Sequence, residues 1–305
     1  MTITARRRAL VLWVAGAAAA QAMVAAGVSV ARAATPRATT DAGRLFRIAK
    51  AGVPDSFVLG TIHTADARVA VIEKPVAAAL ARSRTLAVEL VPEAHDAQLL
   101  ELEQSDGERL DALVGRDAYA RLRAELLARD VPAAAVERLK PWAAMLKVAR
   151  SAPGQPAPAL DDLLFSEARK QRINILPLEL LEEQIAAFDT IPREAQLALL
   201  MHALDHRAAL EANTEATTAA WLRGDLGALS RIALHADGPF AAMRPHYAQL
   251  VAHIIHGRTA LMHHRLFMPL RSGHVFVAIG ALHLHGEKGL LALLRKDGYR
   301  ATRVW

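Results

Sequence analysis

The stretch VFVAIGALH, residues 275–283, places five apolar residues in a row before Gly280, with His283 three positions later. A short apolar run without polar alternation is typical of a strand that is buried on both faces of a parallel sheet. The stretch SFVLGTIH, residues 56–63, has the same order of apolar run, glycine and histidine, ending at His63. The two Gly-x-x-His motifs therefore predict two buried strands, each with a histidine just beyond its carboxyl end.

The glycines of the two motifs suggest how these histidines are directed. Glycine has no Cβ and tolerates backbone conformations that other residues avoid. Gly60 and Gly280 are therefore expected to turn the chain sharply off the two strands. This turn would aim His63 and His283 at one edge of the sheet.

The rest of the chain alternates between short apolar runs and helical patterns. Strands are predicted at residues 45–48, 85–88, 173–176 and 301–304. Helices are predicted at residues 72–82, 94–152, 161–171, 182–230, 240–266 and 286–296. This alternation indicates an α/β fold, in which helices cover a mixed, largely parallel sheet. Residues 42–305 are expected to form one domain, with a helical insertion over about residues 94–270.

The N-terminus has the parts of an export signal. Three arginines, residues 6–8, precede an Ala-rich apolar run at residues 9–30, and Ala-Arg-Ala at residues 31–33 supplies the small residues that a signal peptidase requires. Cleavage is expected before Ala34, leaving residues 34–41 as a flexible leader of a periplasmic or secreted protein. The alternative is an uncleaved membrane anchor, because the apolar run is long enough to span a bilayer. The arginine pair leaves Sec and Tat export both open.

The composition is that of a globular protein. Apolar residues make up 53% of the 305 residues and charged residues 22%, which excludes an intrinsically disordered chain. The chain has 37 basic and 31 acidic residues, but residues 1–33 contain four of the arginines and no acid, so 33 basic and 31 acidic residues remain after cleavage. No basic run is interleaved with aromatic residues. Nucleic-acid binding is therefore not expected.

Three polar residues are expected to meet at the carboxyl edge of the sheet, where open α/β sheets bind their ligands. They are His63, His283 and Glu89, which follows the strand predicted at residues 85–88. Cysteine is absent, so a metal ion would depend on His, Asp or Glu. Two imidazoles and a carboxylate suit a divalent metal with open positions, which polarises a carbonyl and lowers the pKa of bound water. The predicted chemistry is hydrolysis.

Each of these residues also has an ordinary structural interpretation. A single Gly-x-x-His motif is common by chance, and a histidine at a strand end often makes only a structural hydrogen bond. Glu89 could be the first solvated residue after its strand. The repeated motif together with an acid at a third strand end favours the functional interpretation.

Two further sets of polar residues lie on or next to predicted elements. His202 and His206 lie four positions apart on a predicted helix, but the glutamate of an HExxH zinc motif is missing. They are expected to lie at the surface or to hydrogen-bond between helices. Glu179 follows a predicted strand. One interpretation is that it hydrogen-bonds a histidine that holds the metal, without binding the metal itself. The other is that it is an acidic residue at a helix N-terminus.

Several stretches accompany the two motifs. Near the C-terminus are Gly286-Glu287 and Gly298-Tyr299. In the interior are Pro141-Trp142, Asp161, Leu178-Glu179, Glu183-Gln184 and Gly224-Asp225. With these residues and Glu89, the sequence resembles the TraB/PrgY/GumN family, whose animal relatives include the Tiki proteases. The resemblance covers about residues 44–304, nearly all of the expected mature chain.

This resemblance implies a metal-dependent hydrolase, in the first place a peptidase, that prefers Mn²⁺ or Co²⁺, with Zn²⁺ or Fe²⁺ as further candidates. It implies a fold related to the erythromycin-esterase and ChaN-like proteins. The family's motif histidines correspond to His63 and His283 and its glutamate to Glu89, which are the implied metal ligands. His63 and Glu89 are also the implied catalytic groups. The implied substrate is a peptide or a small-molecule ester or amide.

One position departs from the family pattern. Where the family commonly has an Arg-Asn pair on the helix before the last strand, this chain has Arg258-Thr259. Arg258 is expected to orient a carboxylate or a substrate oxyanion and so to act in catalysis. Thr259 lacks the amide donor and acceptor that position a ligand in the family, so a less competent site is one expectation.

Other functions stay open at this point. The first alternative is a hydrolase without a metal, in which His63 acts as the general base, as in erythromycin-esterase-like enzymes. A resemblance to ChaN-like proteins allows a non-catalytic periplasmic protein that holds haem or iron with the same histidines. A family member that has lost catalysis and serves protein interaction is a third alternative.

Overall fold

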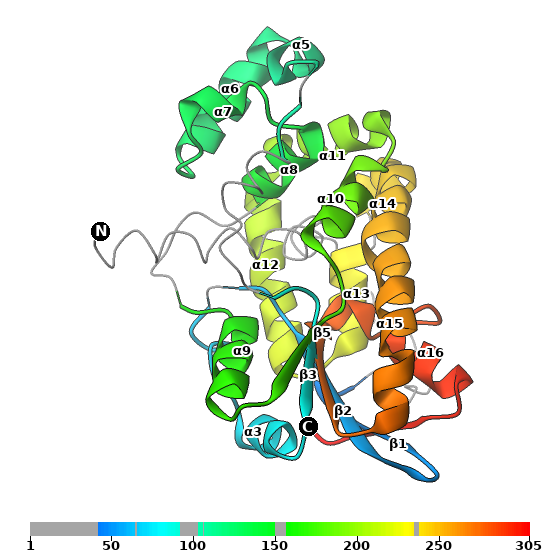
Figure 1. Cartoon of the computed structure of the whole chain (residues 1–305). Coiled ribbons are helices and arrows are strands. Elements are labelled where there is room, and N and C mark those ends of the chain that lie inside the picture. The colour runs from blue at the N-terminus through cyan, green and yellow to red at the C-terminus, as the bar shows by residue number, and fades with distance from the viewer. Residues whose placement is uncertain (1–41, 65, 92–102, 106, 150–156, 235–237) are drawn as a thin grey trace, which may run out of the picture.

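The computed structural model describes residues 42–64, 66–91, 103–105, 107–149, 157–234 and 238–305. Figure 1 draws the remaining segments as a thin grey trace. The predicted signal peptide and leader lie outside the described residues, as does the predicted start of the helical insertion at residue 94.

Six strands in the described part of the chain form one sheet with the order β4-β3-β5-β2-β1-β6 (Figure 1). Their bounds are β1 (Leu45–Lys50), β2 (Val53–Thr61), β3 (Thr85–Val88), β4 (Asn174–Pro177), β5 (Val275–Gly280) and β6 (Arg300–Arg303). The neighbours β2-β5, β5-β3 and β3-β4 run parallel, whereas β1 pairs antiparallel with β2 and β6. The prediction of an α/β fold with a mixed, largely parallel sheet is confirmed.

The strand with the most apolar sequence lies in the middle of the sheet. All six residues of β5 are buried, because the strand has a neighbour on each side and helices on both faces. Phe276 pairs with Phe57 of β2 and with Leu86 of β3. The two strands that carry the Gly-x-x-His motifs are therefore direct neighbours, and their carboxyl ends lie at the same edge.

Helices cover both faces of the sheet (Figure 1). α3 (Lys74–Ala81) and α9 (Leu160–Lys170) lie on one face, and α15 (Arg258–Ser272) and α16 (Leu290–Lys296) lie on the other. The predicted helical block comprises α5 (Leu110–Val114), α6 (Arg116–Leu127), α7 (Ala133–Val136), α8 (Pro141–Ala149), α10 (Leu181–Asp189), α11 (Arg193–Asp205), α12 (Arg207–Leu222), α13 (Leu226–Leu234), the 3₁₀ helix η1 (Gly238–Met243), α14 (Arg244–Leu250) and the π-helix η2 (Val251–Gly257). Among the described helices, none is both long and apolar enough to cross a bilayer.

Two predicted helices differ from the observed ones in extent. The C-terminal helix begins only at Leu290, because the chain first turns at Gly286, whose φ is +85°. The helix predicted over residues 182–230 is divided into several helices. One division falls at Pro192, which precedes α11 and has no N–H to continue the preceding helix.

Candidate functional site

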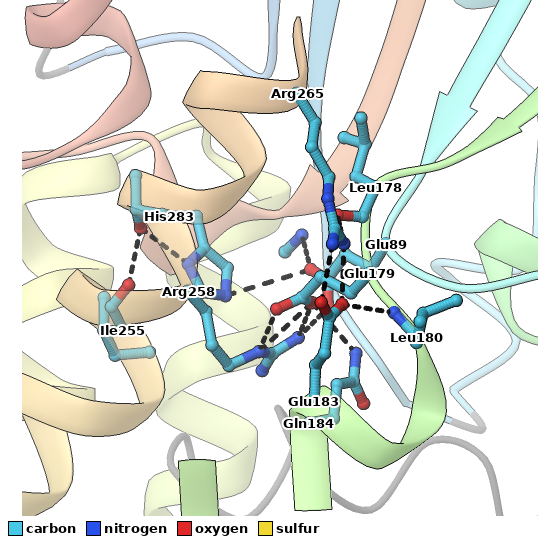
Figure 2. A network of polar contacts seen from close by, with 12 residues as sticks. Glu89, Leu178, Glu179, Leu180, Glu183, Gln184, Ile255, Arg258, Arg265 and His283 are labelled. Carbon is cyan, nitrogen blue, oxygen red and sulfur yellow. Dashed lines mark hydrogen bonds and ion pairs between the residues drawn. The ribbon is translucent and has the colours of Figure 1, made fainter. Parts of the chain in front are cut away.

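Four strand ends bring polar side chains to the carboxyl edge of the sheet. His63 follows β2, Glu89 follows β3, Glu179 follows β4, and His283 ends the 3₁₀ turn η3 (Ala281–His283) after β5. Glu89, Glu179 and His283 belong to one network of polar contacts (Figure 2). His63 lies close enough to Glu89 for an electrostatic interaction. The strand ends that the sequence identified therefore meet.

Glu89 is at the centre of the network. Its Oε2 accepts a hydrogen bond from Arg258 Nη2 at 2.7 Å, and its Oε1 accepts one from the backbone N–H of Gly280 at 2.6 Å. His283 Nε2 lies 3.9 Å from Oε1. Burial by itself raises the pKa of Glu89, but Arg258, the two histidines and the N–H of Gly280 together outweigh burial and lower this pKa to about 2. The buried Glu89 carboxylate is therefore ionised at neutral pH.

Arg258 bridges two buried carboxylates. Its Nε donates to Glu179 Oε1 at 3.0 Å, and its Nη2 donates to Glu179 Oε2 at 2.6 Å as well as to Glu89 (Figure 2). Gln184 Nε2 also donates to Glu179 Oε2, at 3.1 Å. One guanidinium balances only one negative charge. Burial, together with the charge of Glu89, therefore raises the pKa of Glu179 despite the contact with Arg258.

The helix that carries Arg258 is irregular just before it. Residues 251–257 form the π-helix η2, and α15 begins at Arg258. Arg258 contacts the carboxylates, whereas the next residue, Thr259, contacts His283. π-helical turns are frequent at functional sites. Here the irregular segment immediately precedes two consecutive buried residues that serve different partners in the site.

His283 is held in one orientation. Its Nδ1 lies 2.8 Å from Thr259 Oγ1, and that hydroxyl donates to the carbonyl oxygen of Ile255 at 2.6 Å. Since the Thr259 proton is used, Nδ1–H of the imidazole is the donor and Nε2 carries the lone pair. Nε2 is buried and makes no hydrogen bond. Burial lowers the pKa of His283 to about 4, so the ring is neutral at pH 7.

Thr259, the position that departs from the family pattern, still orients a site histidine. Its hydroxyl accepts a hydrogen bond from His283 and donates one to Ile255. A hydroxyl provides one donor and two acceptor lone pairs, which suffices for both contacts. At this position a hydroxyl therefore supplies a donor and an acceptor to the site, although the amide of the family pattern is missing.

His63 has a different environment. Its Nδ1 lies 3.3 Å from Asp161 Oδ2, which is an ion-pair distance without the geometry of a hydrogen bond. Asp161 lies in the first turn of α9, and its Oδ1 accepts a hydrogen bond from Thr61 Oγ1 at 2.9 Å. The side chain of His63 is 14% exposed, against 1% for His283. His63 is thus the more accessible of the two motif histidines.

Asp161 is a site residue that the strand-end argument missed. It follows no strand, and only its place in the family resemblance pointed to it. Burial, together with the charge of Glu89, raises the pKa of Asp161 although His63 lowers it. The contacts to Thr61 and His63 nevertheless join this carboxyl group to the same edge of the sheet.

The two motif glycines do not adopt the special conformation expected of them. Gly280 has φ −52° and ψ 133°, and Gly60 is part of β2 without a positive φ. Their roles are instead close approach and hydrogen bonding. A Cβ at Gly60 would lie 2.8 Å from Leu284 Cδ1 and 3.0 Å from Ala281 Cβ, so a side chain there would separate β2 from the turn after β5. The N–H of Gly280 binds Glu89.

His202 and His206 belong to another part of the molecule. His202 is buried, and both rings contact Phe240 edge-on at 4.8 and 4.7 Å between ring centroids. His206 Nδ1 lies 3.1 Å from the carbonyl oxygen of His202. The two residues therefore pack in the helical block.

The fit of the site to a metal ion can be judged from its donor atoms. Among the described residues, no group of three or more His, Asp or Glu side chains is already arranged to hold a metal. His283 Nε2 and Glu89 Oε1, however, are 3.9 Å apart, and ligand atoms that share one metal lie roughly 3–4 Å apart. The lone pair of Nε2 has no partner. The donor set therefore fits a cation at this pair.

Comparison with known proteins gives one family match. The model of the TraB/PrgY/gumN family matches residues 44–303. No curated protein and no solved structure matches the chain. The family match includes all the strands of the sheet and every residue of the site.

Proposed function

This chain belongs to the TraB/PrgY/gumN family, and from that premise we propose that it is an exported, metal-dependent hydrolase of amide or ester bonds, in the first place a peptidase. His283, Glu89 and His63 would hold the ion, with Mn²⁺ or Co²⁺ as the first candidates and Zn²⁺ or Fe²⁺ as the others. When bound, such an ion supplies Lewis-acid polarisation of a carbonyl oxygen. The side chains of the protein would orient the ligands and bind the substrate.

The observation that carries the proposal is the unpartnered nitrogen of His283. Nε2 is buried, bears a lone pair, and faces an ionised carboxylate oxygen of Glu89 at 3.9 Å. A buried acceptor without a donor costs about 1–3 kcal/mol. Two facing acceptors are stabilised when a cation lies between them, which is the reason for assigning the cation to this pair.

The charges around the pair support the same assignment. Three buried or half-buried carboxyl groups, Glu89, Glu179 and Asp161, lie at this edge of the sheet. Arg258 pairs with Glu89 and Glu179, whereas Asp161 lies beside His63. The raised pKa values of Glu179 and Asp161 reflect this excess of negative charge, in addition to burial. A divalent cation would compensate it.

The environment of each side chain indicates its role in the proposed reaction. Arg258 holds the carboxylates of Glu89 and Glu179 in place. Glu89, with a pKa of about 2, binds protons weakly and therefore suits charge stabilisation better than proton abstraction. His63 is more exposed than His283 and lies beside Asp161, so of the two histidine ligands we place this one next to the substrate.

Metal analysis of the purified protein tests the proposal. Protein stripped with a chelator and reloaded separately with Mn²⁺, Co²⁺, Zn²⁺ or Fe²⁺ is assayed on fluorogenic peptide and ester libraries, and bound metal is measured by mass spectrometry. Wild type is expected to bind one ion and to need it for turnover. His283→Ala is expected to lose the ion, whereas His264→Ala, at an exposed position of α15, retains it. Absence of bound metal with activity that survives the chelator would overturn the metal assignment.

One observation favours a second candidate, a hydrolase that works without a metal. His63 next to Asp161 is the arrangement of a general base and the acid that orients it, with 3.3 Å between Nδ1 and Oδ2. Activity that survives the chelator but disappears in His63→Ala would identify this mechanism. The haem-binding alternative has less support, because His283 is 1% exposed and faces Glu89 at 3.9 Å.

Export is the remaining part of the proposal, and the chain's first 33 residues carry it. Cleavage before Ala34 predicts that the protein recovered from a periplasmic extract or culture medium begins at Ala34. N-terminal sequencing checks this. A protein that keeps residues 1–33 and sediments with membranes would support the uncleaved anchor instead.

A further inference from the structure

A pocket of about 400 Å³ lies beside the candidate site, against the outer strand of the sheet. Its lining consists of Val91, Phe165, Arg169, Arg172, Ile173 and Ile175. The residues come from α9, from the end of that helix and the start of β4, and from the chain that leaves β3. The lining is thus mainly apolar, with two cationic side chains.

One end of this pocket adjoins the site. Val91 lies two residues after Glu89, and two residues of chain span at most about 7 Å. Phe165 lies four positions after Asp161, which is about one turn of α9. Arg169 is a further turn away. The pocket lining therefore begins with residues close in the chain to the candidate site and continues along α9 to Arg169 and, just beyond the helix, Arg172.

The shape of the surroundings suits an extended chain. β4 is an edge strand, because its only neighbour among the described strands is β3. Some of its backbone N–H and C=O groups therefore face away from the sheet, where an extended peptide can pair with them. The side chains of Ile175 and Phe165 supply apolar surface for the side chains of such a peptide.

The charges of the pocket indicate what the far end of this peptide carries. Arg169 and Arg172 are exposed, and neither has an ion-pair partner within the described part of the chain. The guanidinium of Arg169 lies 4.6 Å from the centroid of the Phe165 ring, which keeps it along the pocket wall. Two guanidinium groups that have no ion pair with any described residue are a favourable site for a carboxylate.

The backbone at Arg172 is a second, independent observation. Arg172 has φ +58° and occupies the residue after the C-cap of α9, where its N–H binds the carbonyl of Arg169 and the N–H of Ile173 binds that of Ala168. Glycine is the usual residue in this helix-terminating motif, because other residues are strained there. The chain turns at Arg172 in this conformation, and the side chain of Arg172 forms part of the pocket lining.

We propose that this pocket binds the substrate of the site as an extended peptide whose carboxylate contacts Arg169 and Arg172, an inference that rests on the proposed peptidase function. From Asp161 to Arg169, α9 rises about 12 Å. Three to four residues of extended peptide span the same distance. The carboxylate therefore lies three to four residues from the bond that is cleaved. It is supplied either by the C-terminus of the peptide or by an acidic side chain.

Binding of three peptides that carry an uncharged dansyl label to the purified protein tests this. Each has the apolar sequence Ala-Val-Ala-Leu at its core. The first ends in a free carboxylate, the second ends in an amide but carries one glutamate, and the third ends in an amide without any acid. Anisotropy is measured in the presence of EDTA so that turnover does not interfere. At least one of the first two is expected to bind at least tenfold more tightly than the third, and their order identifies the source of the carboxylate. Equal binding of all three overturns the proposal.

Substitution of the two arginines locates the effect. Arg169→Gln combined with Arg172→Gln is expected to abolish the preference for a carboxylate. Lys170→Gln, which removes a charge from the same helix outside the pocket lining, is expected to retain the preference. A preference that persists in the double variant overturns the assignment to this pocket.

A further variant distinguishes binding from folding. Arg172→Gly is expected to relieve the backbone strain and to raise Tm by about 2–4 °C, while the preference for a carboxylate weakens. Asp130→Gly is the matched control, because Asp130 has φ +59° and ends α6 in the same way. It is expected to raise Tm with no change in binding. A more stable Arg172→Gly protein that binds as wild type does overturns the proposal.

Failure of this inference and failure of the proposed function give different results. Hydrolysis of peptides without any preference for acidic ones leaves the metal-dependent peptidase in place and removes the pocket proposal. Carboxylate-dependent binding without hydrolysis under any metal leaves the pocket and removes the peptidase.

Discussion

The two Gly-x-x-His motifs have nearly the same sequence pattern but end in different environments. His283 is 1% exposed and its Nδ1 is bound by Thr259, which is itself bound to Ile255. His63 is 14% exposed and has only an ion-pair contact of 3.3 Å with Asp161. A rigid buried imidazole suits a fixed ligand, and an accessible one suits contact with substrate. The difference shows that a repeated motif does not imply a repeated role.

Removing the charge between the carboxylates should have the largest effect on the fold. Arg258→Met leaves Glu89 and Glu179 buried without their counter-charge, and breaking such a buried pair costs about 3–5 kcal/mol of unfolding free energy. Urea denaturation measures it. Arg265→Met, which removes a partly exposed pair with Glu183, is the control and should cost about 1 kcal/mol or less. Equal losses of unfolding free energy in the two variants would show that the buried ion pairs of Arg258 stabilise the fold no more than the partly exposed pair of Arg265.

The pH dependence of stability should reveal the burial of His283. Its pKa is lowered to about 4, so between about pH 6.5 and 4 the unfolded chain binds a proton that the folded protein does not. Stability therefore falls as the pH falls through this window, by up to about 3 kcal/mol for this residue. Glu89, whose pKa is lowered, contributes its own loss only below about pH 4.5.

Urea denaturation between pH 7.5 and 4 measures this loss. His283→Asn should have a flatter dependence than wild type. His202, whose pKa burial also lowers to about 4, acts in the same window, so His202→Phe separates the two contributions. An unchanged dependence in His283→Asn would contradict the described environment of its imidazole.

The hydroxyl that orients His283 offers a smaller and sharper test. Thr259→Val keeps the shape of the side chain but removes the acceptor from the buried Nδ1–H, which should cost about 1–3 kcal/mol of unfolding free energy. Thermal or urea denaturation checks the loss. Thr259→Ser retains the hydroxyl and should recover most of it. If Val and Ser behave alike, the hydroxyl does not hold the ring.

The hydroxyl of Thr61, which contacts Asp161 next to His63, should contribute least to the unfolding free energy. Thr61→Val removes the hydrogen bond to Asp161 Oδ1, which is partly buried, and should cost about 1 kcal/mol. The same denaturation experiment compares it with Thr259→Val. A larger loss for Thr61→Val than for Thr259→Val would reverse the ranking of the two motif environments.

Much of the fold and part of the site follow from local sequence patterns. The apolar runs of β2, β3 and β5 and the polar residues that follow them could be predicted because side-chain periodicity and strand burial are properties of a few adjacent residues. Parallel strands then place their carboxyl ends at one edge, which brought His63, Glu89 and His283 together without knowledge of any contact. The helix end before Pro192 is also determined by local sequence, but the predicted helix over residues 182–230 ran through this proline.

The contacts made by Asp161, Thr259 and Arg258 could not be predicted in this way. Asp161 follows no strand and reaches the site from the N-terminus of α9, 100 positions beyond Thr61. The expectation that Arg258 orients a carboxylate did not identify which carboxylates it would contact. The expectation for Thr259 concerned the missing amide, and the contact of its hydroxyl with His283 depends on the packing of η2 against η3.

The sequence by itself therefore determined the α/β fold, the neighbouring Gly-x-x-His strands and the set of residues at the carboxyl edge, because strand burial and direction are set locally. Only the tertiary structure decided that the imidazole of His283 is buried, neutral and held in one orientation while that of His63 stays accessible. These environments depend on groups that are far apart in the chain. The buried carboxylates next to Arg258, and the unpartnered Nε2 of His283, exist only once those groups have packed together.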